Sequence, residues 1–105
     1  MPKIQPTMSY QLIRNYTEKF SWIDKNSGLK QQGFNPPRNA LEVERLPFFI
    51  RFVTQTGKLE SGYAVCIKVD LRKKQRMIQF VESQEIRRVC DYLILEIDGV
   101  RFVTH

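Results

Sequence analysis

Apolar and polar residues alternate with a period of two along most of the chain after residue 47. Residues 48–53 place Phe48, Ile50 and Phe52 on one side and Phe49, Arg51 and Val53 on the other. This pattern predicts a β-strand with one buried face and one mixed face. A turn signal at residues 56–58 separates it from a second strand. That strand is predicted to point Tyr63, Val65, Ile67 and Val69 inward and Ala64, Cys66, Lys68 and Asp70 outward.

Shorter strands separated by polar turns follow this pair. A third strand carries Ile78 and Phe80 on its inner face, between polar tips at residues 72–75 and 82–85. The apolar pattern then predicts a fourth strand at Ile86–Val89, a fifth with Leu93, Leu95 and Ile97 on one face, and a last one at Val100–Thr104. Asp98-Gly99, between the last two, is the strongest turn signal in the chain, because a two-residue type I′ turn needs positive φ at both positions.

Five or six short strands with turns between them predict an antiparallel β-meander that curls into a small barrel. The expected fold class is α+β, mainly β: an N-terminal helix plus a five- to six-stranded antiparallel barrel, SH3-like in architecture. The length of 105 residues fits a single domain over residues 1–105. Residues 1–47 would form the helix and a proline-containing connector, and residues 48–105 the meander. The sequence does not fix the strand order.

Residues 9–23 favour a helix, with Ser9 as its N-cap. Its apolar residues recur at helical spacing and fall on one face: Leu12, Ile13, Tyr16, Phe20 and Ile23. The rival interpretation is a hairpin over residues 20–32, in which Gly28 supplies the positive φ of the turn. Pro36-Pro37 then predicts an extended connector over residues 33–47. Within it, residues 40–46 could form one helical turn that Pro47 ends.

The charge of the chain is positive and locally concentrated. Its formal net charge is +6, while 42% of residues are hydrophobic and 27% charged, as in ordinary globular proteins. Cations gather at the turn after the second strand, and the neighbouring strands could add more, so the candidate nucleic-acid-binding residues are Lys68, Arg72, Lys73, Lys74, Arg76, Arg87 and Arg88. Phosphate binding needs several cations close together. The competing interpretation is a solvated hairpin tip, whose charges only discourage edge pairing.

Aromatic residues could strengthen a nucleic-acid site, because bases stack on aromatic faces. Phe49 and Tyr92 lie off the predicted apolar faces, and Trp22 sits beside the predicted helix face. No aromatic residue is embedded in the basic tip itself. Packing of these rings between the helix and the barrel is the alternative interpretation.

The sequence predicts no catalytic residues, no metal site and no cofactor. Metal sites need three or four cysteine or histidine ligands, but Cys66, Cys90 and the terminal His105 are far apart. The cysteines are expected to be buried, reduced thiols. The acidic residues fall on turns and outer faces, as expected for solvated carboxylates, and the glycines lack a phosphate-loop pattern: Glu82, Glu85, Asp91, Glu96 and Asp98; Gly57, Gly62 and Gly99.

Two functional hypotheses follow, both non-enzymatic. The first is a nucleic-acid-binding accessory protein that uses the basic hairpin tip; RNA, DNA and an acidic protein surface fit the charge equally. The second is a protein-interaction or self-assembly module, binding a partner or a second copy through a sheet edge or an aromatic groove. Its apolar surface would come from Phe49, Val53, Val81 and Val103. No apolar run resembles an export signal or a membrane span, so the expectation is a cytoplasmic protein without a membrane partner.

Overall fold

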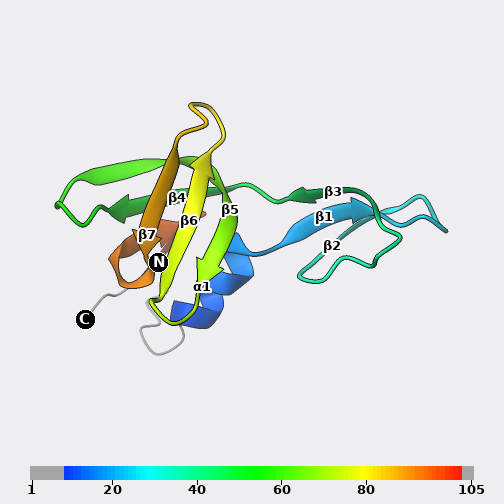
Figure 1. Cartoon of the computed structure of the whole chain (residues 1–105), viewed down its shortest axis with the longest axis horizontal. Coiled ribbons are helices and arrows are strands. Elements are labelled where there is room, and N and C mark those ends of the chain that lie inside the picture. Colours follow the sequence, from blue (N-terminus) through cyan, green and yellow to red (C-terminus); the bar gives the residue numbers. More distant parts are fainter. Residues whose placement is uncertain (1–8, 103–105) are drawn as a thin grey trace.

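The computed structural model describes residues 9–102, and these form two antiparallel sheets, one α-helix and one short 3-10 helix (Figure 1). The three-stranded sheet has the order β2-β1-β3, and the six-stranded sheet the order β7-β6-β5-β4-β8-β9. The elements are α1 (Ser9–Thr17), β1 (Phe20–Ile23), β2 (Lys30–Gly33), β3 (Leu41–Arg45), β4 (Phe48–Val53), β5 (Leu59–Asp70), β6 (Gln75–Phe80), β7 (Ile86–Cys90), η2 (Asp91–Leu93), β8 (Ile94–Ile97) and β9 (Val100–Arg101). The mainly β class with one small helix is therefore confirmed.

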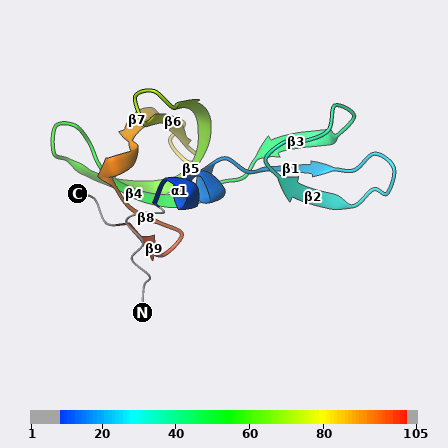
Figure 2. The ribbon, with the colours of Figure 1, turned by 90° about the horizontal axis from the view of Figure 1, so that it is seen from below.

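The six-stranded sheet curls but does not close (Figure 2). Strands β4 to β7 form the predicted meander. The chain then passes through η2 and returns on the other side of β4, where β8 pairs with it. Strands β7 and β9 thus end as the two edges of one open sheet. The expected closed, SH3-like barrel is not formed.

A single apolar core lies against this sheet and is covered by α1. The helix contributes Ile13, which is buried, together with the half-buried Leu12 and Tyr16. The sheet contributes the buried residues Phe48, Ile50, Phe52, Ala64, Cys66, Ile78, Val89, Ile94 and Ile97, and Phe102 joins them just after β9. Phe52 and Phe80 stack with their ring centroids 6.3 Å apart. Burial of this set is the main force that holds the helix on the sheet.

The predicted faces of β5 are wrong for residues 63–66 and correct for residues 68–70, because the strand changes phase between Cys66 and Lys68. Ala64 and Cys66 are fully buried, whereas Tyr63, expected inside, is 64% exposed. Ala64 pairs with Phe48, which fixes its side chain on the core face. A register shift between Cys66 and Lys68 then moves Lys68 to the opposite face. A β-bulge inserts one residue in this way and inverts the alternation beyond it.

The predicted face of β8 is also wrong, for the same physical reason. Ile94 and Ile97 are the buried residues, while Leu93 and Leu95 are only half-buried. Ile97 pairs with Ile50 and Ile94 with Phe52, so three steps in β8 match two steps in β4. The Asp98-Gly99 turn is as predicted, with positive φ at both residues. Residues 103–105, including Val103 and His105, lie outside the described part of the chain.

The helix is shorter than predicted, and the rival hairpin interpretation is correct. Helix α1 ends at Thr17, and Phe20 and Ile23 belong to β1, which pairs with β2. Gly28 has φ +72° in the turn, and the Asp24 carboxylate accepts hydrogen bonds from the Ser27 hydroxyl and the Asn26 amide at 2.9 and 3.3 Å. Asx geometry of this kind competes effectively with a helix. The expected helical turn at residues 40–46 is wrong as well, since β3 pairs with β1.

Residues 20–45 form an arm that projects from the rest of the molecule, which we call the body (residues 9–19 and 46–102; Figures 1 and 2). The arm accounts for the elongated shape of 47 × 29 × 29 Å. Within the arm only Ser21 is buried, and Leu29, Leu41 and Val43 are 45–62% exposed. At its root the Leu46 amide donates to the Lys19 carbonyl at 3.0 Å, and the Arg45 guanidinium lies 4.4 Å from the Phe20 ring centroid.

Candidate nucleic-acid interface

The turn between β5 and β6 carries three adjacent, exposed cations: Arg72, Lys73 and Lys74. Its shape comes from Asp70, whose Oδ1 accepts hydrogen bonds from the backbone amides of Arg72 and Lys73 at 3.1 and 3.2 Å. Lys74 completes the turn with φ +53°. The Asp70 carboxylate, which lies at the start of the tip, thus accepts hydrogen bonds from backbone amides. The three cationic side chains are left for solvent or a ligand.

Two further cations join the tip through the register of the sheet. Lys68 pairs with Met77, and Met77 pairs with Arg88, so the three residues form one row across β5, β6 and β7. Directly opposed residues project from the same face of a sheet. This row flanks a shallow hollow of about 70 Å³, lined by Lys68, Asp70, Lys73, Gln75, Arg76, Met77 and Arg88. Pockets that enclose drug-sized ligands measure about 300–1,000 Å³, so the hollow suits a small charged group instead.

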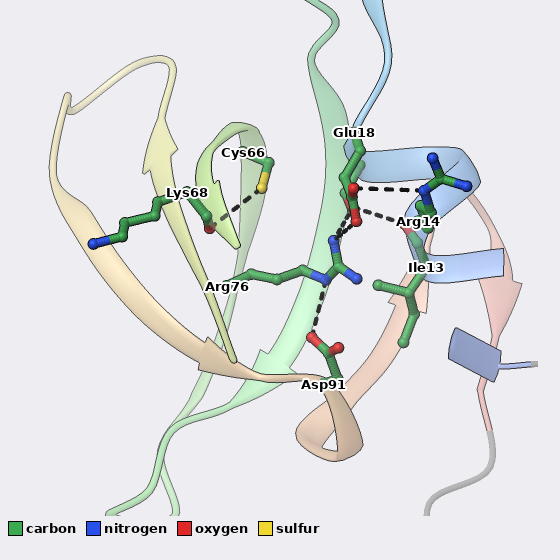
Figure 3. Close-up of polar contacts among 8 residues, drawn as sticks. Ile13, Arg14, Glu18, Cys66, Lys68, Arg76 and Asp91 are labelled. Atoms are coloured by element: carbon green, nitrogen blue, oxygen red, sulfur yellow. Dashed lines mark hydrogen bonds and ion pairs between the residues drawn. The ribbon is translucent and has the colours of Figure 1, made fainter. Parts of the chain in front are cut away.

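Arg76 does not belong to this surface, contrary to the sequence-based expectation. Its side chain is 1% exposed and enters the core, while Lys68 points the other way (Figure 3). Its guanidinium donates to Asp91 at 2.9 Å and to the Thr17 hydroxyl at 3.0 Å, and it also pairs with Glu18. Arg76 therefore ties β6 to α1 and to η2.

The charge state of this buried cluster follows from its contacts. Burial alone would lower the pKa of the Arg76 guanidinium, but the hydrogen bond to Glu18 and the charge of Asp91 raise that pKa above its ordinary value. The guanidinium is therefore charged at every physiological pH. Burial raises the pKa of Asp91, and the neighbouring Arg76 charge opposes this shift.

Arg87 is also separate from the basic tip. It opposes the buried Ile78 in the register, on the other face from Arg88. Its guanidinium pairs with Glu60 at 3.0 Å and Glu85 at 2.8 Å, so its charge is already balanced. Five of the seven predicted cations thus share one region. We call this set, Lys68, Arg72, Lys73, Lys74 and Arg88, the basic surface.

Two exposed residues lie beside the tip: Leu71, which the sequence pattern did not single out, and Tyr92, which it indicated as an aromatic residue that could stack on a base. Leu71 opens the turn and is 62% exposed, and Tyr92 in η2 is 58% exposed. Tyr92 lies next to the tip because the Asp91 amide donates to the Lys74 carbonyl at 2.9 Å. The sequence marked Tyr92 as an exposed aromatic, but nothing in it could place η2 beside a turn about 20 residues earlier in the chain.

The thiols and carboxylates offer no competing site in the described residues. No group of three or more metal-ligating side chains occurs there. Cys66 and Cys90 are buried and not bonded to each other. Burial raises the pKa of the Cys66 thiol, which keeps it protonated and unreactive. The Cys90 sulfur accepts a hydrogen bond from the Gln55 amide at 3.3 Å.

A second, wider groove of about 420 Å³ lies at the other end of β5. It runs between the start of β5 and the β6–β7 turn, and its walls mix apolar residues with charges of both signs. Tyr63 and Phe80 supply its aromatic surface, and Glu60 and Arg87 meet across it in an ion pair. This groove is a second candidate surface of the body.

Comparison with known proteins adds no family to this picture. No protein-family model matches the chain, and no similar protein was found among curated sequences or solved structures. Between residues 9 and 102, no helix is both long enough and apolar enough to span a bilayer. The function must be argued from the geometry alone.

Proposed function

We propose that this chain is a non-enzymatic, nucleic-acid-binding accessory protein that holds the phosphate backbone on the basic surface. The observation that carries the proposal is the convergence of Lys68 and Arg88, on two different strands, with the three cations of the β5–β6 turn. A turn that is charged only for solubility does not require that convergence. Sequence-independent binding of nucleic acid does, because each phosphate contact adds affinity by releasing counterions.

The basic surface is electrostatically available. Within residues 9–102, none of its five side chains takes part in an ion pair, whereas Arg14, Arg76 and Arg87 all do. Of its acidic neighbours, Asp70 accepts backbone hydrogen bonds, and Asp91 is buried and paired with Arg76. Cations without intramolecular partners lose no ion pair when they bind a phosphate. Their field also draws a polyanion toward this side of the protein.

The test is a salt titration of oligonucleotide binding with two triple variants of equal charge. Arg72→Gln/Lys73→Gln/Lys74→Gln removes three cations from the basic surface, and Lys25→Gln/Lys30→Gln/Arg38→Gln removes three exposed cations from the arm. The tip variant is expected to lower the slope of log affinity against log salt by roughly 2 for a single strand. The arm variant should keep the wild-type slope. Equal losses in both variants would show that only total charge matters, and no binding at low salt would end the proposal.

A protein-interaction module remains a second candidate, favoured by the arm. Strands β2 and β3 are the two edges of the arm sheet, and apolar Leu41 and Val43 on β3 are half exposed. Exposed edges bind partner strands. However, Glu42 and Glu44 alternate with these residues, and Glu42 has φ +49° beside a register shift, features that commonly protect an edge from pairing. Sedimentation analysis at increasing concentration tests self-association, and a monomer throughout would remove this version.

A further inference from the structure

The tip combines its cations with exposed apolar side chains, and this combination narrows the class of nucleic acid. We infer that the basic surface takes a single strand, with a base stacked on the ring of Tyr92 and phosphates on the tip cations. The inference rests on the proposed function and deepens it. Its experiment is therefore chosen to separate the failure of one from the failure of the other.

The backbone at Tyr92 is held close to the basic turn by strand pairing and one hydrogen bond. Gln75 pairs with Cys90, and the Asp91 amide then donates to the Lys74 carbonyl at 2.9 Å. Tyr92 follows Asp91 in the chain, so its backbone lies one residue from this contact with the basic turn. Tyr92 is 58% exposed, which leaves the residue accessible to a ligand.

The same segment is anchored from inside the body. Asp91 is buried and accepts a hydrogen bond from Arg76 Nε at 2.9 Å, and the Arg76 guanidinium is held in turn by Thr17 and Glu18 (Figure 3). Arg76 is thus a positioning residue: it fixes the short helix that carries Tyr92. A stacking platform that is already ordered loses little conformational entropy when a base binds.

Leu71 gives the turn a second exposed apolar residue. It is 62% exposed and directly precedes Arg72. Contacts to a phosphate backbone alone make no use of exposed apolar surface. In a duplex the faces of the bases are hidden by stacking, but in a single strand they are free to pack on aromatic and apolar side chains. Cations beside a ring therefore favour a single strand over a duplex.

The test compares oligothymidylate with a DNA hairpin of the same phosphate number, by fluorescence anisotropy at low salt. Tyr92→Leu removes the ring, and Tyr63→Leu is the matched control. Tyr63 is a similarly exposed tyrosine on β5, roughly 23 Å from the tip at about 3.3 Å per residue. Tyr92→Leu is expected to weaken oligothymidylate binding by at least about fivefold without changing the salt slope. Tyr63→Leu and Tyr92→Phe should bind as the wild type does.

The other outcomes separate failure of this inference from failure of the proposed function. If the wild type binds single strand and hairpin equally and Tyr92→Leu has no effect, the inference is overturned. The proposed function still stands in that case if the tip triple variant loses binding. Absence of binding to either oligonucleotide overturns both. Binding to vesicles rich in anionic lipid, but to no oligonucleotide, also overturns both and would assign Leu71 and the cations to a membrane surface. If Tyr92→Leu does not fold, two other measurements test the inference: the wild-type preference for single strand over hairpin, and the affinity of Tyr92→Trp. Tyr92→Trp is expected to match or exceed the wild-type affinity for the single strand.

Discussion

The body and the arm are built from the same kind of antiparallel strand, yet they are held together differently. The body buries one face of a six-stranded sheet under α1, where eleven buried hydrophobic residues form one core cluster. The arm has no second layer. Its three strands keep their backbone hydrogen bonds, and Trp22 packs over Gly33 within the sheet. Phe34 contacts the body, where its ring centroid lies 4.6 Å from the Arg14 guanidinium.

Strand pairing alone therefore does not determine the stability of either region. A three-stranded sheet satisfies its inner backbone groups wherever it lies, but its free energy depends on the apolar surface it removes from water. The arm is therefore expected to be a unit of low local stability attached to a stable body. The basic surface and Tyr92 are on the body, so binding to nucleic acid should not require an ordered arm.

The largest effect is expected from Arg76, which holds the body together. Arg76→Met leaves Asp91 and Glu18 without their shared cation, and breaking a buried ion pair in this way costs about 3–5 kcal/mol. Arg87→Met is the control, because its ion pairs are solvated and screened, so its loss of stability should be much smaller. Urea unfolding followed by circular dichroism measures both. Equal losses would mean that the buried network does not anchor α1 and η2.

The next effect compares an apolar residue of each region. Ile78 is fully buried in the body, and Leu41 is 47% exposed on the arm. Ile78→Ala should cost about 2–5 kcal/mol through lost burial and the cavity left behind. Leu41→Ala should cost about 0.5 kcal/mol or less, as surface substitutions do. A large loss for Leu41→Ala would show that the arm stabilises the body more than its burial suggests.

The site illustrates what the sequence could predict. The tip cations were found because a hairpin turn is local: a polar run between two alternating segments is exposed wherever the sheet goes. Arg76 was misplaced although the same alternation carries it, since Arg76, Ile78 and Phe80 fall on one face. The charge of Arg76 favours an exposed position, but its guanidinium is buried because it meets acidic partners 15 and 58 residues away in the chain.

Other features could not be predicted, because they depend on pairing between distant segments. The bulges in β5 and β8 invert the faces of both strands, and each is defined only by its partner strand. In the same way, the return of β8 to β4 decides that the sheet stays open. Tyr92 meets the tip only because β7 pairs with β6. Propensity and period describe each strand, whereas the site is made by their registers.

A smaller effect should appear when the two regions are unfolded together and watched separately. Trp22 is the only tryptophan of the chain and lies on β1 of the arm. Its fluorescence therefore reports the arm, while the circular dichroism signal comes mainly from the larger body. We expect the fluorescence transition at a lower urea concentration than the circular dichroism transition. Coincident transitions would show a single cooperative unit and contradict the separation drawn between arm and body.

The smallest effect is expected from Gly33, where the arm has its tightest contact. A Cβ at this position would lie 3.0 Å from Cη2 of Trp22, so the ring must move by a few tenths of an ångström to admit it. Gly33→Ala should therefore shift the emission of Trp22. It should leave the circular dichroism midpoint unchanged within the roughly 0.5 kcal/mol typical of surface substitutions.

Gln32→Ala is the control for Gly33→Ala, because Gln32 is the exposed neighbour on the same strand. Gln32 pairs with Ser21, on the opposite face of the sheet from Trp22. It should change neither signal. A change in the body midpoint with Gly33→Ala would mean that packing in the arm is transmitted to the core. The route would be the arm root, where Leu46 bonds to Lys19 and Arg45 covers Phe20. Without such a change, the arm is an appendage whose packing can be altered while the basic surface keeps its geometry.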